Sequence, residues 1–141
     1  MKDYGQLFKR LSKSVIKNKP TISIFGDNHK THDGTCVRDF IDINDIVNIH
    51  KLIIKNKNKI KKNIIMNCGY GNGISVLKII KYFENIVKKS IKIKILKKRK
   101  DEISNIYANN KKITKIFGWK PMYQNIFLSI KRSVNWEKKI S

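Results

Sequence analysis

The sequence has few of the features that mark secreted, disulfide-stabilised or membrane-spanning proteins. It contains only two cysteines, Cys36 and Cys68, and no Cys-x-x-Cys spacing, which argues against a disulfide framework or a zinc knuckle. No run approaches the roughly 18 consecutive apolar residues that a membrane span needs. The first residues also lack the apolar block of a secretory signal. We therefore predict a soluble, cytoplasmic protein with reduced thiols.

Acidic residues are scarce as well. Ten Asp and Glu stand against 32 Lys and Arg, which gives a formal net charge of +22. Such an excess favours nucleic-acid binding, because clustered cations neutralise phosphates. The lysines are, however, interleaved with Ile and Asn along the whole chain, and no motif combines basic residues with aromatic residues that stack on bases. A basic nucleic-acid-binding protein is therefore the alternative prediction, and the charge by itself predicts only nonspecific binding.

Arginine is rare in a chain that uses lysine for nearly every cation. The planar guanidinium binds carboxylates and phosphates bidentately, which lysine cannot do, so a retained arginine is a candidate for such a contact. Arg38 precedes Asp39, and Arg99 lies close to Asp101 and Glu102, so local salt bridges are the simpler interpretation of both. The arginines are Arg10, Arg38, Arg99 and Arg132.

Apolar periodicity predicts an α/β order within a single domain, residues 1–141. Apolar residues recur with helical spacing in some segments, and they alternate or run continuously next to glycine in others. A cap by Asp42 or Asn44 would begin the second helix. The predicted helices cover residues 4–17, 44–56, 75–89, 109–117 and 123–139, and the predicted extended segments cover residues 21–25, 35–41, 63–69 and 90–96.

The loop CGYGNGIS, residues 68–75, has both a functional and a structural interpretation. Glycines between a strand and a helix allow backbone amides to bind a phosphate. The loop matches neither Gly-x-Gly-x-x-Gly nor a P-loop, because the glycine spacing and the Lys-Ser/Thr ending are absent. We favour a tight structural crossover.

Two other groupings resemble sites but have simpler explanations. Tyr107 and Lys111 have the four-residue spacing of a reductase tyrosine and its lysine, which a lysine-rich chain produces by chance, so we expect no catalytic residue there. His29 and His32 lie close to aspartates, but no second pair of ligands is evident elsewhere. We expect loop histidines and no metal site.

Four blocks of the sequence, in order, carry a family resemblance: ISIFG…THDGTCVRDFI, NCGYGNGISV, RKDEISNIYANNKKITKIFGW and a terminal NWEKK. They resemble the C-terminal part of the UDP-glucose 4-epimerase family, which consists of extended short-chain dehydrogenases/reductases. The order and spacing of the blocks match over nearly the whole chain. The resemblance implies an α/β fold, namely the C-terminal portion of an NAD(P)-binding Rossmann-like enzyme whose N-terminal dinucleotide-binding part is absent here.

The resemblance also implies which residues bind substrate. In the family, the arginines of Val-Arg-Asp and Arg-x-Gly-Asp grip the diphosphate and uridine of a UDP-sugar, which assigns that clamp to Arg38 and Arg99. The phenylalanine of Ile-Phe-Gly contacts the uracil, which assigns that role to Phe25. A local salt bridge and a substrate clamp are thus competing predictions for Arg38.

Three further residues inherit roles in the same way. Gln6 and Leu7 fall where the family has an Asn-Leu or His-Leu pair that contacts the nucleotide sugar. Glu102 falls on an aspartate that contacts the ribose. The sequence departs from the family at this point, because Asp101 replaces the glycine of Arg-x-Gly-Asp and Glu102 lengthens the acid.

The implied activity is the NAD-dependent interconversion of UDP-glucose and UDP-galactose in galactose metabolism. This chain lacks both the family's NAD-binding glycine loop and its Tyr-x-x-x-Lys set. We therefore expect no epimerisation by the chain alone: it is either a truncated remnant or one half of a split enzyme, and in the second case a separate NAD-binding half is its candidate partner. Without that half, the apolar strand over residues 63–69 would be exposed. Another nucleotide-sugar epimerase or dehydratase of the same superfamily is a related possibility.

Overall fold

The computed structural model describes residues 6–141 and confirms the predicted α/β class. All five predicted helices are present, within a few residues of the expected bounds. The helices are α1 (Leu7–Val15), α2 (Ile43–Lys55), α3 (Val76–Val87), α4 (Lys111–Phe117) and α5 (Ile126–Ile140), with a short 3₁₀ helix η1 (Lys57–Lys59). The strands are β1 (Thr21–Phe25), β2 (Val37–Arg38), β3 (Ile74–Ser75), β4 (Lys92–Leu96) and β5 (Asn105–Ile106).

The strands form two small sheets. β1 and β4 pair in parallel, with Phe25 opposite Leu96 at their carboxyl ends. In the second sheet β2 lies between β3, which is antiparallel to it, and β5, which is parallel to it. Because β1 and β4 end at the same edge, the segments that follow them in the chain meet there.

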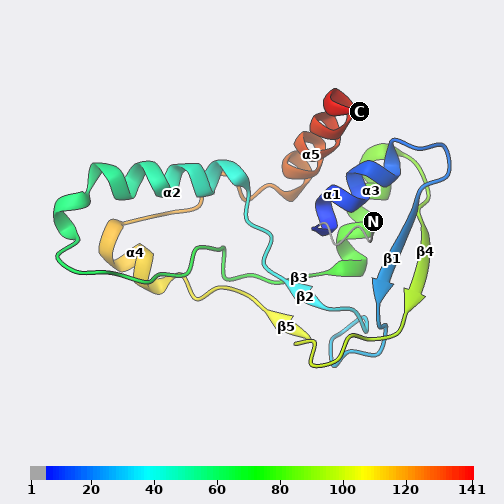
Figure 1. Ribbon diagram of the computed structural model, residues 1–141, viewed down its shortest axis with the longest axis horizontal. Helices are drawn as coiled ribbons and strands as arrows, with labels where there is room; N and C mark the ends of the chain where they lie inside the picture. The colour runs from blue at the N-terminus through cyan, green and yellow to red at the C-terminus, as the bar shows by residue number, and fades with distance from the viewer. Residues whose placement is uncertain (1–5) are drawn as a thin grey trace.

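One hydrophobic core lies between β1 and helices α1, α3 and α5, which gather at one end of the molecule (Figure 1). Alternation along β1 buries Ile22 and Ile24, while helical spacing buries Leu11 in α1 and both Ile80 and Phe83 in α3. The apolar faces that the periodicity predicted are therefore the faces that pack. Within residues 6–141, no helix is both long enough and apolar enough to cross a lipid bilayer.

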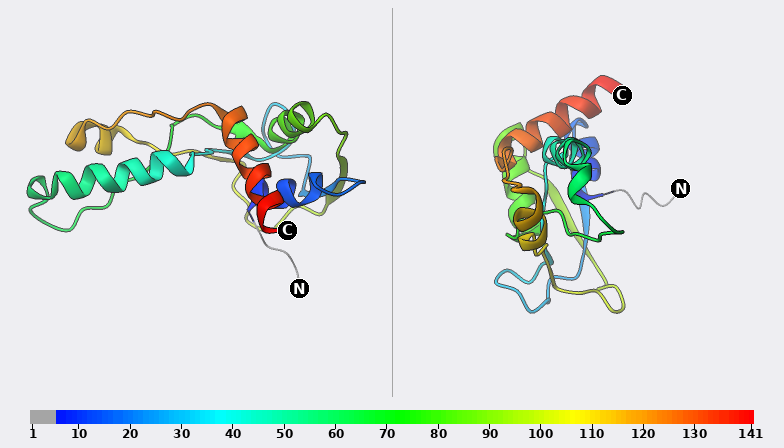
Figure 2. Two further views of the ribbon diagram at one scale, coloured as in Figure 1. Left: turned by 90° about the horizontal axis from the view of Figure 1, so that it is seen from above. Right: turned by 90° about the vertical axis from the view of Figure 1, so that its left-hand side faces the viewer.

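A second, smaller core joins α2 to α4 at the opposite end, so that the molecule is elongated (Figure 2). Ile49 of α2 packs with Ile113 and Phe117 of α4, and Gly118 ends α4 in the left-handed conformation at φ 67°. Of the two caps predicted for α2, Asp42 is the one observed, since its carboxylate accepts a hydrogen bond from the backbone amide two residues further on.

The expected strand over residues 63–69 is wrong. This segment is extended but has no strand partner among the described residues, and Ile65 is 86% exposed. An apolar run becomes a strand only when another strand satisfies its backbone amides and carbonyls. The predicted exposure holds for Ile65 but not for the whole segment, because Met66 and Cys68 are partly buried against the second core.

Candidate functional site

The six residues to which the sequence assigned substrate contacts line one cavity of about 350 Å³. They come from four separate parts of the chain: the start of α1, the end of β1, strand β2, and the loop that follows β4. The parallel pairing of β1 with β4 brings the second and the last of these parts to one edge. The residues are Gln6, Leu7, Phe25, Arg38, Arg99 and Glu102.

Arg38 is held by contacts that differ from its predicted salt bridge. Its Nη2 lies 3.5 Å from Glu102 Oε1, and its Nη1 donates to the carbonyl oxygens of Val37 at 2.8 Å and Ser104 at 3.3 Å. The expected pairing with Asp39 is wrong, because neighbouring residues of an extended backbone point to opposite sides. A guanidinium has five N–H donors, so these contacts leave Arg38 able to bind a further acceptor.

Arg99 lies across the same cavity. Its guanidinium carbon is 3.8 Å from the centre of the Phe25 ring, and its Nη1 is 3.9 Å from Glu102 Oε1, which confirms one of its two predicted acidic neighbours. The Arg99 side chain is about half exposed. Both guanidiniums therefore converge on one carboxylate, and one of them covers a face of the aromatic ring.

The carboxylate of Asp39 holds the glycine-rich loop, residues 68–75, against the protein. It accepts hydrogen bonds from the amides of Tyr70 at 3.1 Å, Gly71 at 2.9 Å and Ala108 at 3.2 Å. A Cβ atom at Gly69 would lie 2.6 Å from Asp39 and from Ala108, so the loop packs directly against the protein. The structural interpretation of CGYGNGIS is confirmed, because an internal anion already binds the amides of Tyr70 and Gly71.

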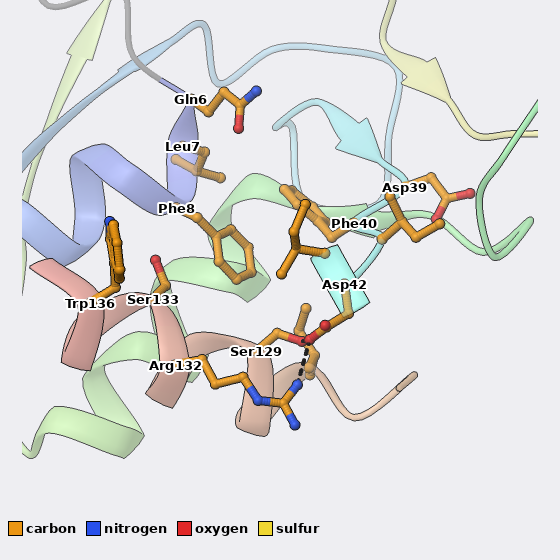
Figure 3. Close-up of a pocket in the computed structure, with 13 residues that line it drawn as sticks. Gln6, Leu7, Phe8, Asp39, Phe40, Asp42, Ser129, Arg132, Ser133 and Trp136 are labelled. Atoms are coloured by element: carbon orange, nitrogen blue, oxygen red, sulfur yellow. Dashed lines mark hydrogen bonds and ion pairs between the residues drawn. The ribbon is translucent and has the colours of Figure 1, made fainter. Parts of the chain in front are cut away.

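A larger cavity of about 800 Å³ adjoins the first, and the two share Gln6, Leu7 and Phe40 (Figure 3). It is mainly apolar and lies between the start of α1, the segment before α2, and α5. Trp136 of α5 borders it and is 60% exposed.

The polar edge of this larger cavity is an ion pair that joins α2 to α5. Arg132 Nη1 donates to Asp42 Oδ2 at 3.0 Å, and the Ser129 hydroxyl donates to the same oxygen (Figure 3). Burial alone would raise the pKa of Asp42, but the hydrogen bonds from Ser129 and Asn44 and the charge of Arg132 outweigh burial and lower it. Arg132 is thus the arginine whose role is to hold two helices together.

Residues 1–69 match the family described as "NAD dependent epimerase/dehydratase family". The chain is 30% identical to a UDP-glucose 4-epimerase of Halalkalibacterium halodurans over 89% of this chain and 37% of the relative. It is 34% identical to UDP-arabinose 4-epimerase 1 of Arabidopsis thaliana over 98% of this chain and 33% of the relative. A crystal structure of UDP-glucose 4-epimerase from Bifidobacterium longum, in complex with NAD⁺ and UDP, superposes with a TM-score of 0.83 and 32% identity over 95% of this chain and 39% of that one.

The chain is therefore similar to proteins of the NAD-dependent epimerase/dehydratase family. Its sequence is UDP-glucose 4-epimerase-like, and its fold is a part of the short-chain dehydrogenase/reductase epimerase fold. It spans about two fifths of the length of these relatives.

NAD is implied by the family, but the residues present do not fit it. The chain contains one glycine-rich loop between an extended segment and a helix, and Asp39 already binds two amides of that loop. Tyr107 and Lys111 offer no substitute for the family's tyrosine and lysine, since Tyr107 is 58% exposed and only Lys111 belongs to α4. No step of a reaction is therefore assigned to residues of this chain.

Sequence reasoning missed Arg10 as a residue of the candidate site. Arg10 lines the 350 Å³ cavity, and its Nη2 donates to the carbonyl oxygen of Ser23 at 2.9 Å. The scarcity of arginine was the signal that could have identified it. Cys36 also lines this cavity, and burial raises the pKa of the thiols of Cys36 and Cys68.

Proposed function

We propose that this chain binds the UDP portion of a UDP-sugar, as the substrate-binding C-terminal part of a UDP-glucose 4-epimerase-like protein. The observation that carries the proposal is the convergence, on one cavity, of six residues that were selected from the sequence alone. These residues lie as far apart in sequence as Gln6 and Glu102. They come from four parts of the chain, which the fold brings to one cavity.

The chemistry of the cavity suits a nucleoside diphosphate. The guanidiniums of Arg38 and Arg99 supply planar donors for phosphate oxygens, and Arg10 adds a third positive charge at the wall. The ring of Phe25 offers an apolar surface for a base, and Glu102 offers an acceptor for a ribose hydroxyl. Binding of the ligand would require Arg99 to leave one face of the Phe25 ring, which its exposure permits.

The contribution of this chain to a reaction would be binding and orientation. Epimerisation of UDP-glucose and UDP-galactose would need an NAD-binding part, which we propose to be a separate polypeptide. The exposed apolar side chains beside the larger cavity, Ile43 at 68% and Trp136 at 60%, support a protein partner on that side. A cytoplasmic location remains a prediction from the sequence.

Calorimetric titration of the purified 141-residue chain with UDP, UDP-glucose and ADP tests the proposal. The parent is expected to bind both uridine nucleotides and to bind ADP more weakly. Arg38→Ala is expected to weaken UDP binding by roughly 10- to 100-fold, because it removes charge-assisted hydrogen bonds that contribute roughly 1.5–3 kcal/mol. Arg38→Lys keeps the positive charge but loses the planar guanidinium that donates two parallel hydrogen bonds, so this variant is also expected to bind UDP more weakly.

Lys100→Ala is the matched control, because it removes the same charge from an exposed residue beside Arg99. Equal losses in Lys100→Ala and Arg38→Ala would indicate a nonspecific anion surface and contradict the proposal. So would equal affinity for ADP and UDP. Tighter binding of single-stranded RNA than of UDP, with a steep salt dependence, would favour the nucleic-acid alternative instead.

A further inference from the structure

Three potential metal ligands meet in the interior, at the wall of the 350 Å³ cavity. His29 and Cys36 are 4% and 6% exposed, and Glu102 joins them from the loop after β4. One donor atom of each residue lies within 4.8 Å of the donor atoms of the other two. Sequence reasoning considered His29 with His32, but His32 is exposed and lies 3.6 Å from Asp33 instead.

The hydrogen bonds of His29 orient its ring as a metal ligand requires. Nε2 lies 3.1 Å from the carbonyl oxygen of Phe25. A carbonyl oxygen only accepts hydrogen bonds, so Nε2 carries the proton and Nδ1 keeps a free lone pair. Cys36 Sγ lies 3.6 Å from Nδ1 and 3.4 Å from Nε2, and the Ser104 hydroxyl donates to Nδ1 at 3.4 Å, a contact that a metal ion would replace. A backbone carbonyl that holds the second ring nitrogen is the usual support of a metal-binding histidine.

Glu102 offers one unused oxygen. Its Oε1 lies 3.5 Å from Arg38 Nη2 and 3.9 Å from Arg99 Nη1. Its Oε2 is buried and has no hydrogen-bond partner among residues 6–141. A buried carboxylate oxygen without a partner is unfavourable, and a bound cation would satisfy it without disturbing the two guanidiniums.

We propose that His29, Cys36 and Glu102 bind a zinc ion. A thiolate, an imidazole and a carboxylate together match the ligand preference of Zn²⁺. With Zn–S of about 2.3 Å and Zn–N of about 2.0 Å at a tetrahedral angle, sulfur and nitrogen should lie about 3.5 Å apart. Cys36 Sγ lies 3.6 Å from His29 Nδ1, which is the separation such a site needs, although it also lies 3.4 Å from Nε2. Three protein ligands leave the fourth position for water.

The charges of the cluster also suit a divalent cation. Zinc binding displaces the thiol proton of Cys36 to solvent, so the thiolate and the Glu102 carboxylate carry two negative charges against the two positive charges of the ion. The occupied cluster is therefore neutral, and binding with release of one proton makes it one charge more positive than the metal-free cluster. The zinc site does not depend on the nucleotide proposal, and it is tested without nucleotide.

Titration of the metal-free chain with Co²⁺, followed by displacement with Zn²⁺, tests the site. Cobalt bound to a thiolate gives a charge-transfer band in the near ultraviolet. One equivalent of Co²⁺ is expected to produce this band, and one equivalent of Zn²⁺ to remove it. Cys36→Ser is expected to abolish the band, while His29→Gln and Glu102→Gln are expected to weaken Zn²⁺ binding by about tenfold or more. The controls Cys68→Ser and His32→Gln are expected to bind like the parent.

A band that survives Cys36→Ser, that disappears in Cys68→Ser, or that never forms would overturn the proposal. Unchanged Zn²⁺ affinity in His29→Gln would do the same. Circular dichroism establishes that each variant is folded. If Cys36→Ser does not fold, X-ray absorption at the zinc edge of the parent chain decides: one sulfur with nitrogen and oxygen ligands supports the site, and a coordination shell without sulfur refutes it.

Discussion

The carboxylate of Asp39 joins two segments that are distant in sequence, and replacing it with asparagine tests whether this junction stabilises the fold. Oδ1 accepts the Tyr70 amide, while Oδ2 accepts the amides of Gly71 and Ala108. Asparagine keeps one acceptor oxygen and puts an NH₂ group in place of the other. Its least costly orientation turns the NH₂ toward Tyr70, so one hydrogen bond is lost and two become neutral.

The magnitude follows from these contacts. A hydrogen bond to a charged group contributes roughly 1.5–3 kcal/mol, against about 1 kcal/mol for a neutral one. Asp39 is only partly buried, so the lower end of the range applies. Losing one charged bond and weakening two others predicts that Asp39→Asn lowers the free energy of unfolding by about 2–3 kcal/mol. Urea denaturation followed by circular dichroism measures this loss.

Asp27→Asn is the matched control, because it makes the same change in charge at an exposed side chain. It is expected to alter the unfolding free energy by less than about 0.5 kcal/mol. Equal losses in the two variants would mean that net charge, and not the junction, determines the effect. A loss below about 0.5 kcal/mol for Asp39→Asn would refute the reasoning outright.

Two further predictions concern the start of α2. The Tyr70 hydroxyl donates to the fully buried carboxylate of Asp45 at 2.7 Å, so Tyr70→Phe should lower the free energy of unfolding, measured in urea, by roughly 1–2 kcal/mol. The control Tyr107→Phe changes an exposed ring and should alter the free energy of unfolding little. Equal effects in the two variants would contradict this prediction. Burial alone would raise the pKa of Asp42, but its hydrogen bonds, of which that from Ser129 has the largest effect, lower it. The stability that ionised Asp42 contributes is therefore present above its unfolded-state pKa of about 3.9. This stability is lost as the pH falls through the lower folded-state pKa. Thermal melts between about pH 5 and pH 2 should therefore show a shallower loss of stability for Asp42→Asn than for the parent, and identical slopes would contradict the assignment.

The helices could be predicted because each one buries a single face. Ile80 and Phe83 of α3 are fully buried, and Ile49 of α2 is 2% exposed, as the helical spacing indicated. The strand over residues 63–69 could not be assessed in this way, because a strand depends on a partner that periodicity does not reveal. Local composition therefore predicted where the helices lie and overestimated the sheet.

The contacts within the candidate site were predictable only in part. Family resemblance selected the residues around the cavity, but local sequence suggested the wrong acid for Arg38. Its partner is Glu102, which is 64 positions away in the chain. The cluster of His29, Cys36 and Glu102 was missed for the same reason. Glu102 follows β4, and it comes close to the other two residues only because β4 pairs with β1.

The scarcity of acidic residues determines how the cavity can select a ligand. Most of the few acids make internal contacts, so the many lysines have little to neutralise them, and the whole surface attracts anions. That attraction is long-range and is screened by salt, so it cannot distinguish UDP from any other anion. Selectivity must therefore come from short-range geometry around the guanidiniums and the Phe25 ring, and it should persist at salt concentrations that abolish binding to the lysines. The acids with internal contacts are Asp33, Asp39, Asp42, Asp45, Glu84 and Glu102.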